Sequence, residues 1–595
     1  MRGVPIVFVA IPLVTIAITS MPGETAIEAR RAQLRAALQQ EWEYQLQVHP
    51  EMATFIGDNR FNDRVSDHSA TFIAEDLEHA KRTLQSIESI DTAGFPEQEK
   101  SNKILMVRRL HERIESARFK DWEMPVDQMN GVHLSYASLP SATPFRSVKD
   151  YEDYLSRLHK LPHVFAQIVA DMQLGLRDGL MPPRYLLEKV ALQAQDIADK
   201  SSHDSPFTQP VFKFPASTSE AEQKRLRDAT LAAVKDEVAP AYASFATFVR
   251  TQYAPKGRTE FGVWALPEGN ARYSFDIRRM TTTDLSPEDI HQLGVKQVGE
   301  IEAEMLKIAH QQGFGDLASF NAHIRNDPQL HASSGQQLLG LYQHYTDQMY
   351  ARLPQLFIHL PKTKLEVIPM EAFRAADAVP ADYSPGAGDG SRPGRINVNE
   401  YDPQHRLLLN VEAIAYHEGI PGHHLQFSIA QELPNLPPFR RFASYDAYSE
   451  GWAFYAERLG KEAGFYQDPY SEYGRLENEM WRSVRLVVDT GVHYKHWSRQ
   501  QMVDFFRQHT AMDEPNIQTE VDRYIAWPAQ ALAYKLGQMK IVELRERARE
   551  ALGDKFDLRT FHDAVLADGP LPLEVLETRI NAWIGSQKSP ESSAR

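Results

Sequence analysis

Apolar residues recur at three- and four-residue spacing through most of the first 250 residues, a pattern that is typical of amphipathic helices. The segment 25–50 is the clearest case, because it is rich in helix formers and ends near Pro50. The spacing therefore predicts an almost entirely helical N-terminal part. The other segments with this spacing are 72–90, 98–119, 149–179 and 221–253.

The pattern changes over residues 259–280, where aromatic and β-branched residues surround a Pro-Glu-Gly-Asn turn. This arrangement predicts a small β-hairpin. A helix is expected to restart at Ser286, which can cap it, with Pro287 in the first helical position.

Two short strands are predicted at 364–370 and 395–399, separated by a loop rich in glycine and proline. The second strand lies just before the candidate metal-binding segment, so it could form the edge on which an extended peptide pairs. The whole pattern predicts a mainly α-helical protein with a small β-hairpin or sheet near the active-site helix.

Residues 24–585 are expected to form a single helical unit. It consists of an N-terminal helical part at 24–257 and a part at 258–585 that carries the candidate chemistry. The last residues, 586–595, are expected to be a disordered tail.

Residues 1–23 are predicted to be a secretory signal peptide, which implies a periplasmic or secreted protein. Arg2 precedes an apolar run over residues 4–18, and Ala17 and Thr19 suit a cleavage site. An uncleaved membrane anchor is the alternative, but the run is shorter than the ~20 residues that a spanning helix needs. No stable membrane insertion is expected once the signal is removed.

Composition narrows the class of protein. The chain has 595 residues, of which 42% are hydrophobic and 24% charged, as in ordinary globular proteins. Its 65 Lys and Arg residues face 80 Asp and Glu residues, and the formal net charge of -15 argues against a nucleic-acid partner. The sequence contains no cysteine, so any metal must be bound by His, Asp and Glu. None of these features determines the oligomeric state.

The segment 415–426, AYHEGIPGHHLQ, contains three histidines and a glutamate within eight residues. His417 and Glu418 begin it like the H-E-x-x-H motif of zinc peptidases, but a proline occupies the place of the second histidine. The candidate partners are His423 and His424. In a straight helix the first lies ~240° around the axis from His417 and the second lies ~10.5 Å further along, so neither suits an undistorted helix.

Pro421 and Gly422 can resolve this difficulty, because proline removes a backbone donor and glycine tolerates unusual dihedral angles. We expect them to bulge or break the helix and to bring His423 or His424 back towards His417. The alternative is a histidine cluster on the surface or in the core, without a metal.

The aromatic-rich segment 444–460 supplies carboxylates at a suitable separation. Glu450 lies 26 residues after His424 on a predicted helix, and it is the expected third metal ligand. Glu457 lies seven residues further on the same helix face and could orient a ligand histidine through its ring N–H. The alternative is that both are solvated acids on a helix face.

Four segments together resemble a large bacterial domain-of-unknown-function family that is marked by H-E-G-x-P-G-H-H and grouped with gluzincin-type metallopeptidases. They are HEGIPGHHLQ, SEGWAFYAE, RLVVDTGVHYKHWSRQQM and RYIAWPAQALAYKLGQMKI. The resemblance extends over most of the chain after the predicted signal peptide. It implies a large two-lobed helical body with a deep central channel, similar to thimet oligopeptidase and angiotensin-converting enzyme.

The resemblance also implies roles for the motif residues. Glu418 would be the general base of the reaction. Zn²⁺ would be bound by His417, by His423 or His424, and by Glu450. The departure from H-E-x-x-H leaves the second histidine undecided.

Arg482, Arg485, Asp489 and His493 follow one another at three- and four-residue spacing on one predicted helix face. They could bind a peptide carboxylate or support the metal ligands. The alternative is a ladder of ion pairs within the helix.

Further candidates follow in the last of the four segments. Tyr524 and Tyr534 could donate a hydrogen bond to the oxyanion of a tetrahedral intermediate, and His493 is a candidate for the same role. Arg523 and Lys535 could bind the C-terminus of a substrate. For each tyrosine the alternative is simple packing.

These observations lead to the hypothesis of a secreted or periplasmic zinc metallopeptidase that hydrolyses short peptides, with Glu418 activating the attacking water. One alternative is a non-catalytic envelope protein that binds peptides or metal in the same cleft. Another is a metal-dependent hydrolase of a different amide or ester. Glu418 argues against pure binding, because a binding site needs no base.

Overall fold

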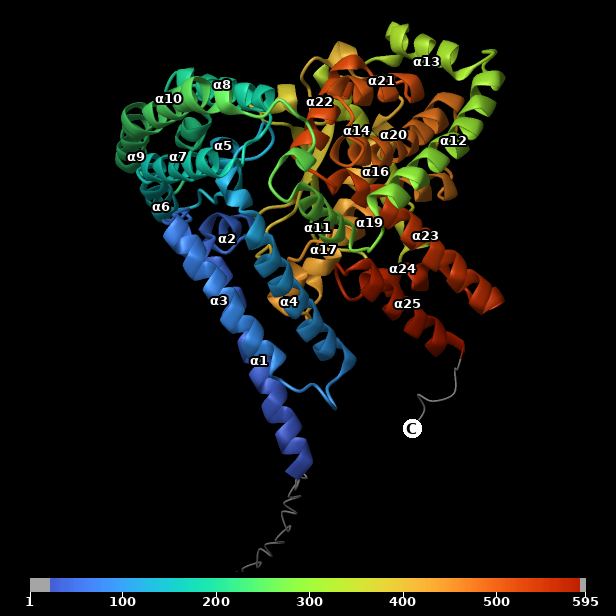
Figure 1. Cartoon of the computed structure of the whole chain (residues 1–595), viewed down its shortest axis with the longest axis horizontal. Coiled ribbons are helices and arrows are strands. Elements are labelled where there is room, and N and C mark those ends of the chain that lie inside the picture. Colours follow the sequence, from blue (N-terminus) through green and yellow to red (C-terminus); the bar gives the residue numbers. More distant parts are fainter. Residues whose placement is uncertain (1–21, 589–595) are drawn as a thin grey trace, which may run out of the picture.

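The computed structural model describes residues 22–588 and shows a mainly helical protein with one small sheet, as predicted (Figure 1). The predicted signal peptide lies outside the described residues, apart from its last two positions, which begin the first helix. Residues 586–588 of the predicted tail belong to the last helix, and the rest of the tail lies outside the described residues.

The N-terminal helices share their hydrophobic core with helices from the far end of the chain. These helices are α1 (Pro22–Val48), α2 (Pro50–Ile56), α3 (Ala70–Glu88), α4 (Glu97–Ser116), α19 (Asp446–Glu462), α23 (Ala533–Leu552) and α25 (Leu573–Lys588). Leu38 and Leu110 from the first group belong to the same buried cluster as Trp452, Ile541 and Leu576 from the second. The N-terminal helices therefore support the helix that carries Glu450.

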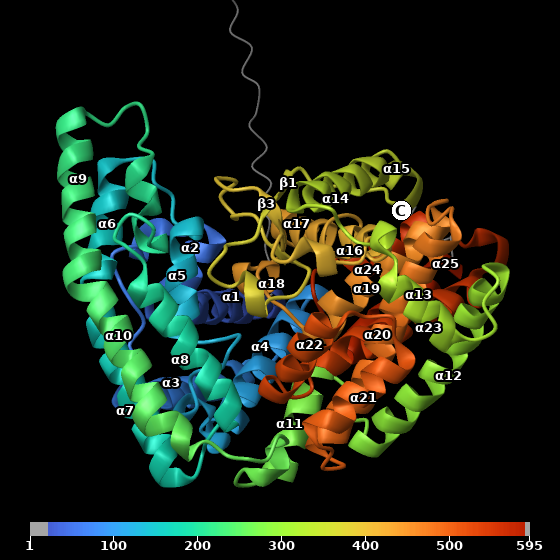
Figure 2. The same ribbon diagram turned by 90° about the horizontal axis from the view of Figure 1, so that it is seen from above.

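The next six helices form a lobe with a core of its own (Figure 2). They are α5 (Val132–Ala142), α6 (Val148–Leu158), α7 (Leu161–Asp178), α8 (Arg184–Asp199), α9 (Glu220–Ala233) and α10 (Ala239–Phe248). Leu158, Phe165, Val190 and Tyr242 lie in its buried cluster. We call these helices the first lobe.

The remaining helices and the sheet build the lobe that carries the candidate site. The helices are α11 (Gly269–Thr281), α12 (Pro287–Gln311), α13 (Leu317–Asn326), α14 (Gly335–Tyr350), α15 (Leu353–Leu356), α16 (Val411–Glu418), α17 (His423–Glu432), α18 (Pro438–Arg441), α20 (Pro469–His493), α21 (Arg499–His509), α22 (Glu514–Ala526) and α24 (Leu558–Leu566). As predicted, Ser286 caps α12, since its side chain accepts a hydrogen bond from the Asp289 amide. Val298 of α12 and Val488 of α20 belong to one buried cluster.

The small sheet has the strand order β1-β3-β2. Its strands are β1 (Leu365–Pro369), β2 (Ala381–Ser384) and β3 (Gly394–Val398). β1 and β3 are parallel and form where strands were predicted, whereas β2 is antiparallel to β3 and lies in the predicted loop. Because β3 is the central strand, both of its edges are paired. The expectation that it offers an edge to a peptide is therefore wrong.

The predicted hairpin at 259–280 is also wrong. This segment forms a 3₁₀ turn at Val263–Ala265 and then α11. Tyr273, Ile277 and Met280 recur at helical spacing and are buried in one cluster. The spacing of the buried positions, and not the β-branched and aromatic composition, decides the local structure.

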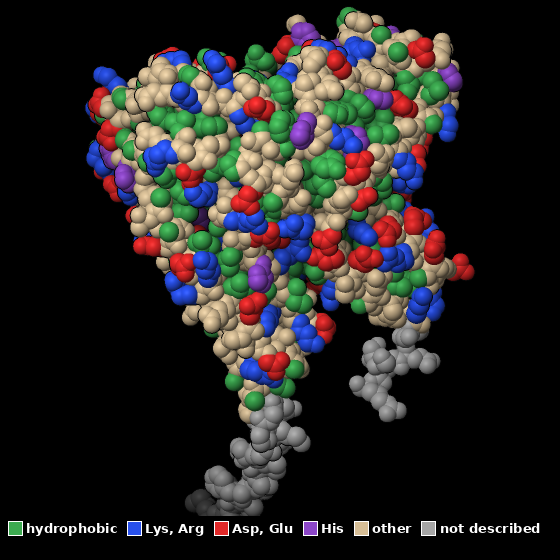
Figure 3. All heavy atoms as spheres, viewed as in Figure 1, with side chains coloured by type: hydrophobic (Ala, Val, Ile, Leu, Met, Phe, Trp, Pro, Cys, Tyr) green, Lys and Arg blue, Asp and Glu red, His purple; other side chains and the backbone are tan. Residues whose placement is uncertain are grey.

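A cavity of about 190 Å³ lies where the two lobes face each other. Val126 and Pro183 line it from the side of the first lobe, and Leu266 and Trp527 line it from the other. Trp527 also lines the larger cavity at the candidate site, so the two spaces meet at this side chain. On the outer face, basic and acidic side chains are interspersed (Figure 3). No helix within residues 22–588 combines the length and apolar character that membrane crossing requires.

Helices α19 and α23 approach each other closely where two glycines meet. A Cβ atom on Gly537 would lie 1.8 Å from the carbonyl oxygen of Ala447, and one on Gly451 would lie 2.5 Å from the Cα atom of Gly537. Glu450 precedes one of these glycines, and Tyr534 lies about one turn before the other. This contact therefore fixes the position of two candidate site residues relative to each other.

Replacing Gly537 by alanine should destabilise the fold by about 1–3 kcal/mol, because the added methyl group collides with main-chain atoms. Gly299 of α12 is the matched control, since an added Cβ atom there meets nothing within 4 Å. Gly299→Ala should keep or raise the melting temperature, because alanine favours a helix. Melting temperatures of both variants and the wild type provide the measurement. Equal values for Gly537→Ala and the wild type would contradict the close approach.

Candidate metal centre

The helix that carries His417 is interrupted directly after Glu418. α16 ends there and α17 begins at His423 (Figure 1). In the turn between them, the amide of Gly422 donates a hydrogen bond of 3.0 Å to the carbonyl oxygen of Tyr416. A Cβ atom on Gly422 would lie 2.0 Å from the carbonyl oxygen of His417, so this close return requires glycine. The predicted break at the Pro-Gly pair is confirmed.

The break places His423 next to His417. Their ring centroids are 4.9 Å apart, and the ring planes are nearly perpendicular, at 88°. Glu450 of α19 completes a group in which one possible ligand atom from each side chain lies within 4.8 Å of the others. Both histidines are buried and Glu450 is half-buried.

The distances within this group fit a tetrahedral metal ion. Glu450 Oε2 lies 3.4 Å from Nε2 of His417 and 3.3 Å from Nε2 of His423. Ligand atoms bonded to a tetrahedral zinc ion at about 2.0–2.1 Å are separated by roughly 3.3–3.4 Å. Glu450 Oε2 is buried without a hydrogen-bond partner in the described part of the chain, as expected for an atom that binds a cation.

The charge of Glu450 suits a ligand. Burial disfavours its ionised form, but the facing rings of His423 and His417 outweigh this effect and hold the pKa of Glu450 well below its usual range. The carboxylate therefore stays ionised, which metal binding requires.

Glu457 fixes the ring of His417. Its Oε1 accepts a hydrogen bond of 2.8 Å from Nδ1–H of His417, and the glutamate is 1% exposed. This bond leaves the lone pair of Nε2 directed at Glu450, which is the tautomer that binds a metal. Nη2 of Arg482 lies 3.5 Å from the same Oε1 and offsets its charge. The structure thus brings Glu457 into the orienting position expected from the sequence.

His424 points away from this group. Its Nδ1 accepts a hydrogen bond of 3.0 Å from the hydroxyl of Tyr383, and its Nε2–H donates one of 3.1 Å to the carbonyl oxygen of Thr363. Burial lowers the pKa of His424 to about 4, so the ring is neutral. Both nitrogens are occupied, and the geometry selects His423 from the two histidines that the sequence left open.

Glu418 lines a cavity of about 340 Å³ together with the three possible ligands. Within residues 22–588, its carboxylate takes part in no hydrogen bond or ion pair. Burial raises the pKa of Glu418 to about 8, while the charges of His423 and Arg482 oppose the increase. A carboxyl group of this kind can exchange a proton with a bound molecule, because its pKa lies near neutral pH.

Tyr534 lines the same cavity, and its ring stacks 6.0 Å from the ring of His417. The Tyr534 oxygen accepts hydrogen bonds from Nη2 of Arg523 at 2.8 Å and from Nε2 of Gln530 at 3.5 Å. Because the oxygen acts as the acceptor in both bonds, the phenolic proton remains available to a ligand in the cavity.

His493 and Asp489 do not line this cavity. Nδ1 of His493 accepts a hydrogen bond from the Val263 amide at 3.1 Å, and its Nε2–H donates to the Tyr524 carbonyl oxygen at 2.9 Å. Asp489 accepts a bond of 2.6 Å from the Tyr273 hydroxyl. The expected role of His493 at the oxyanion does not fit this placement, because both ring nitrogens hold the backbone.

Tyr524 and Lys535 are also used elsewhere. The Tyr524 hydroxyl donates to Glu520 and accepts a bond of 2.8 Å from Nε of Arg485. Lys535 lies 2.9 Å from Glu479 and is buried. Neither residue lines the metal-site cavity, so the expected contacts with an oxyanion and with a substrate C-terminus do not fit. Of the arginines named from the sequence, Arg482, Arg485 and Arg523 do line it.

Several lining side chains were not expected from the sequence. Asp382 and Tyr383 belong to β2, which lies in a segment rich in glycine and proline and lacks a clear alternating pattern. Asp446 lies in the first turn of α19, four residues before Glu450, and this spacing was the available signal. Trp481 and Trp527 carry no sequence feature that distinguishes a lining aromatic residue from a packed one.

A bacterial family described as "Bacterial protein of unknown function (DUF885)" matches residues 50–580. The chain belongs to this family. The expected resemblance to a bacterial family of unknown function is confirmed at this level, and the family description assigns no activity to DUF885 members.

Two solved structures share the fold of this DUF885 protein. A "putative lipoprotein" from Colwellia psychrerythraea is 29% identical, with a TM-score of 0.87 over 94% of this chain and 99% of that one. A "putative lipoprotein of unknown function" from Shewanella oneidensis is 17% identical, with a TM-score of 0.68 over 92% of this chain and 99% of that one. The second likeness shows the fold alone. A comparison with curated proteins found no match.

The ligand assignment predicts that the zinc-reconstituted wild type binds about one ion per chain. Glu450→Ala and His423→Ala should each fail to bind the zinc ion, because each variant keeps only two of the three protein ligands that such a site needs. His424→Asn is the matched control and should keep the ion, since its ring nitrogens bind protein groups. Elemental analysis of the purified variants measures the effect. If His424→Asn lost the zinc ion and His423→Ala kept it, His424 would be the second histidine ligand in place of His423.

Proposed function

We propose that this DUF885 protein is a zinc-dependent metallohydrolase that cleaves short peptides. One observation carries the proposal: the unpartnered carboxylate of Glu418 lies in the same cavity as His417, His423 and Glu450. A site that only stored a metal would not need a free base beside it. The cavity volume of about 340 Å³ suits a small ligand and is too small for a folded protein.

The chemistry of a hydrolase would be divided among few groups. Zinc, when bound by His417, His423 and Glu450, polarises a carbonyl group and lowers the pKa of water. Glu418 takes a proton from the attacking water on its carboxylate and returns it to the leaving nitrogen. Tyr534 donates its phenolic proton in a hydrogen bond to the developing oxyanion. Of the three residues that the sequence suggested for this role, Tyr534 lines the cavity, whereas Tyr524 and His493 do not.

A peptide is the amide that the surroundings of the site favour. β2 is an edge strand, and its residues Ala381, Asp382 and Tyr383 line the cavity. An extended peptide that paired with this edge would run past the possible metal ligands. The alternative of a hydrolase for another amide or ester has no such support. The free carboxylate of Glu418 argues against the alternative of a non-catalytic binding protein.

A periplasmic or secreted location is part of the proposal. It is supported by the predicted signal peptide and by the description of the 29% identical Colwellia psychrerythraea structure as a putative lipoprotein. This sequence contains no cysteine, the residue that carries the lipid in bacterial lipoproteins, so that form of anchoring is not carried over.

Glu418→Gln should lower kcat for a cleaved peptide by about 10²–10⁴-fold, because the amide cannot accept the water proton. The variant should still bind about one zinc ion, since Glu418 is not among the three possible ligands. Cleavage is measured on a mixed library of short peptides, together with the zinc content. Full activity in Glu418→Gln would exclude it as the base. A zinc-loaded wild type that leaves every peptide intact would refute peptidase activity.

Tyr534→Phe should reduce kcat by about 10²–10³-fold with little change in KM, because the lost hydrogen bond forms mainly in the transition state. Tyr524→Phe is the matched control, since that hydroxyl does not line the cavity. Steady-state kinetics on one peptide compares the two variants. Equal decreases in kcat for the two variants, or a change in KM without a decrease in kcat, would contradict the role of Tyr534.

A further inference from the structure

Three arginine side chains meet in the wall of the metal-site cavity and are almost completely buried. Their exposed fractions are 3% for Arg482, 1% for Arg485 and 8% for Arg523. Their guanidinium carbon atoms lie 6.0, 4.3 and 5.8 Å, respectively, from the centroid of the Tyr534 ring. Three cations are thus gathered around the residue that is proposed to contact the oxyanion.

The acidic partners of these arginines are too few. Glu520 accepts a bond of 2.9 Å from Arg485 and lies 3.6 Å from Arg523. Glu457 lies 3.5 Å from Arg482, but it already accepts the hydrogen bond from the metal-site histidine. Burying a cation costs free energy unless a negative charge accompanies it. Among the residues that the structure describes, the three cations therefore have two acidic contact partners, one of which is also bound to His417.

Four of the guanidinium nitrogen atoms have no hydrogen-bond partner within residues 22–588. They are Nε and Nη1 of Arg482, Nη1 of Arg485 and Nε of Arg523. Planar N–H groups of this kind bind carboxylate and phosphate oxygens, often through two parallel hydrogen bonds.

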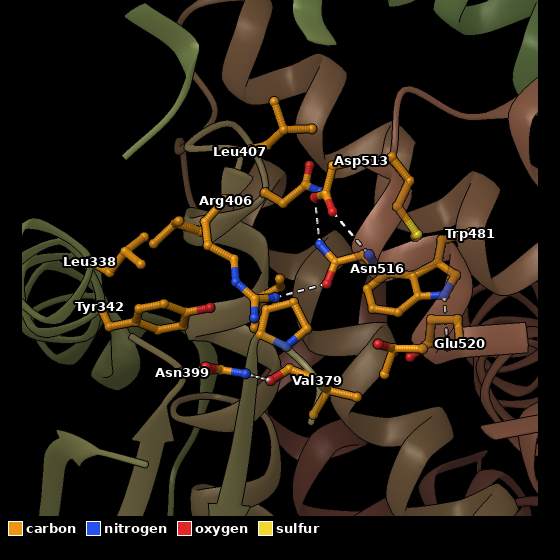
Figure 4. A pocket seen from close by; sticks show the side chains of 16 residues that line it. Leu338, Tyr342, Val379, Asn399, Arg406, Leu407, Trp481, Asp513, Asn516 and Glu520 are labelled. Carbon is orange, nitrogen blue, oxygen red and sulfur yellow. Dashed lines mark hydrogen bonds between the residues drawn. The ribbon is translucent and has the colours of Figure 1, made fainter. Parts of the chain in front are cut away.

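A small pocket that shares Trp481 with the metal-site cavity contains the half-buried Arg406 (Figure 4). Arg406 donates to Oδ1 of Asn516 at 2.8 Å and to the carbonyl oxygen of Tyr401 at 3.2 Å. In the described part of the chain it has no buried nitrogen without a partner. This pocket has a volume of about 30 Å³, room for one or two water molecules. The unpartnered nitrogens of Arg482, Arg485 and Arg523 instead belong to residues that line the metal-site cavity.

We infer that Arg482, Arg485 and Arg523 bind the free α-carboxylate at the C-terminus of a peptide whose scissile carbonyl lies at the metal centre. This inference rests on the proposed function and specifies its substrate. A terminal carboxylate supplies a negative charge and acceptors for the unpartnered N–H groups. The Arg523–Tyr534 hydrogen bond would also connect the bound terminus to the oxyanion donor.

The distance between the arginines and the metal centre limits how many peptide residues can lie between the bound C-terminal carboxylate and the scissile carbonyl. The ring centroids of Tyr534 and His417 are 6.0 Å apart. Because every guanidinium carbon lies within 6.0 Å of the Tyr534 centroid, none is more than about 12 Å from the His417 ring. An extended residue spans about 3.3–3.6 Å, so at most about three residues fit. The protein should release one to three residues from the C-terminus.

The first experiment compares N-acetylated peptides that differ only at the C-terminus. The free acid should be cleaved with a kcat/KM at least about tenfold higher than that of the amide, and mass spectrometry should find products of one to three residues. An amidated peptide ending in glutamate separates a terminal from a side-chain carboxylate, and it should react like the plain amide. Equal rates for acid and amide would overturn the inference while the proposed function stands. Cleavage of the glutamate amide at the rate of the acid would also overturn it.

The second experiment measures binding without turnover. Calorimetry on the metal-free protein should find that N-acetylphenylalanine binds at least about tenfold more tightly than its amide. Arg482→Gln should remove most of this preference. Arg279→Gln is the matched control and should keep the preference for the acid. Arg279 pairs with Asp276 in the cavity between the two lobes and does not line the metal-site cavity.

The two experiments separate the inference from the proposed function. Equal binding of acid and amide by the metal-free wild type overturns the inference, even if peptides are cleaved. Preferential binding of the acid, combined with no cleavage of any peptide by the zinc-loaded protein, supports the carboxylate site and rejects the hydrolase. If Arg482→Gln does not fold, the comparison of acid and amide on the wild-type chain still decides.

Discussion

The return of the chain between α16 and α17 is the constraint on which the candidate metal centre depends. Gly422 lies so close to the carbonyl oxygen of His417 that no side chain fits, and this contact turns His423 back towards His417. The indole N–H of Trp452 donates a bond of 2.9 Å to the carbonyl oxygen of Pro421. Trp452 lies two residues after Glu450 on α19, so one hydrogen bond aligns the turn with the helix that supplies the third possible ligand. A helix with H-E-x-x-H spacing needs no such alignment, because its two histidines already share a face.

Buried charge connects this centre to the rest of the cavity. His417 is held by Glu457, which in turn faces Arg482 on α20. Each contact offsets part of the free-energy cost of removing a charge from water. Loss of one partner would therefore leave its neighbour as a buried charge without compensation. Arg482 therefore connects the possible metal ligands to Arg485 and Arg523. The core that α19 and α23 share with the N-terminal helices supplies the rigid packing that such a polar network requires.

The sequence predicted those features that short-range spacing controls. The helices, the break at Pro421 and Gly422 and the grouping of the site around one motif follow from local patterns. The choice between His423 and His424 could not be made, because it depends on the path of the turn in three dimensions. His493 was misplaced because helical spacing shows which residues share a face but not how far along the helix the cavity extends. Arg485 lines the cavity, whereas His493, about two turns further along α20, contacts Val263 and Tyr524. The hairpin at 259–280 failed because composition was given more weight than the helical spacing of its apolar residues.

The two lobes contribute unequally to the cavity. Every described lining residue lies between positions 374 and 534 except Met129, which comes from the segment just before α5. None of the possible metal ligands, the free carboxylate or the arginines therefore belongs to the first lobe. The first lobe instead borders the neighbouring cavity at Val126 and Pro183, where the two spaces meet at Trp527. A change in the position of the first lobe would alter access to the cavity at this junction. It would leave the distances between His417, His423 and Glu450 unchanged, because no residue of that lobe contacts any of these three side chains.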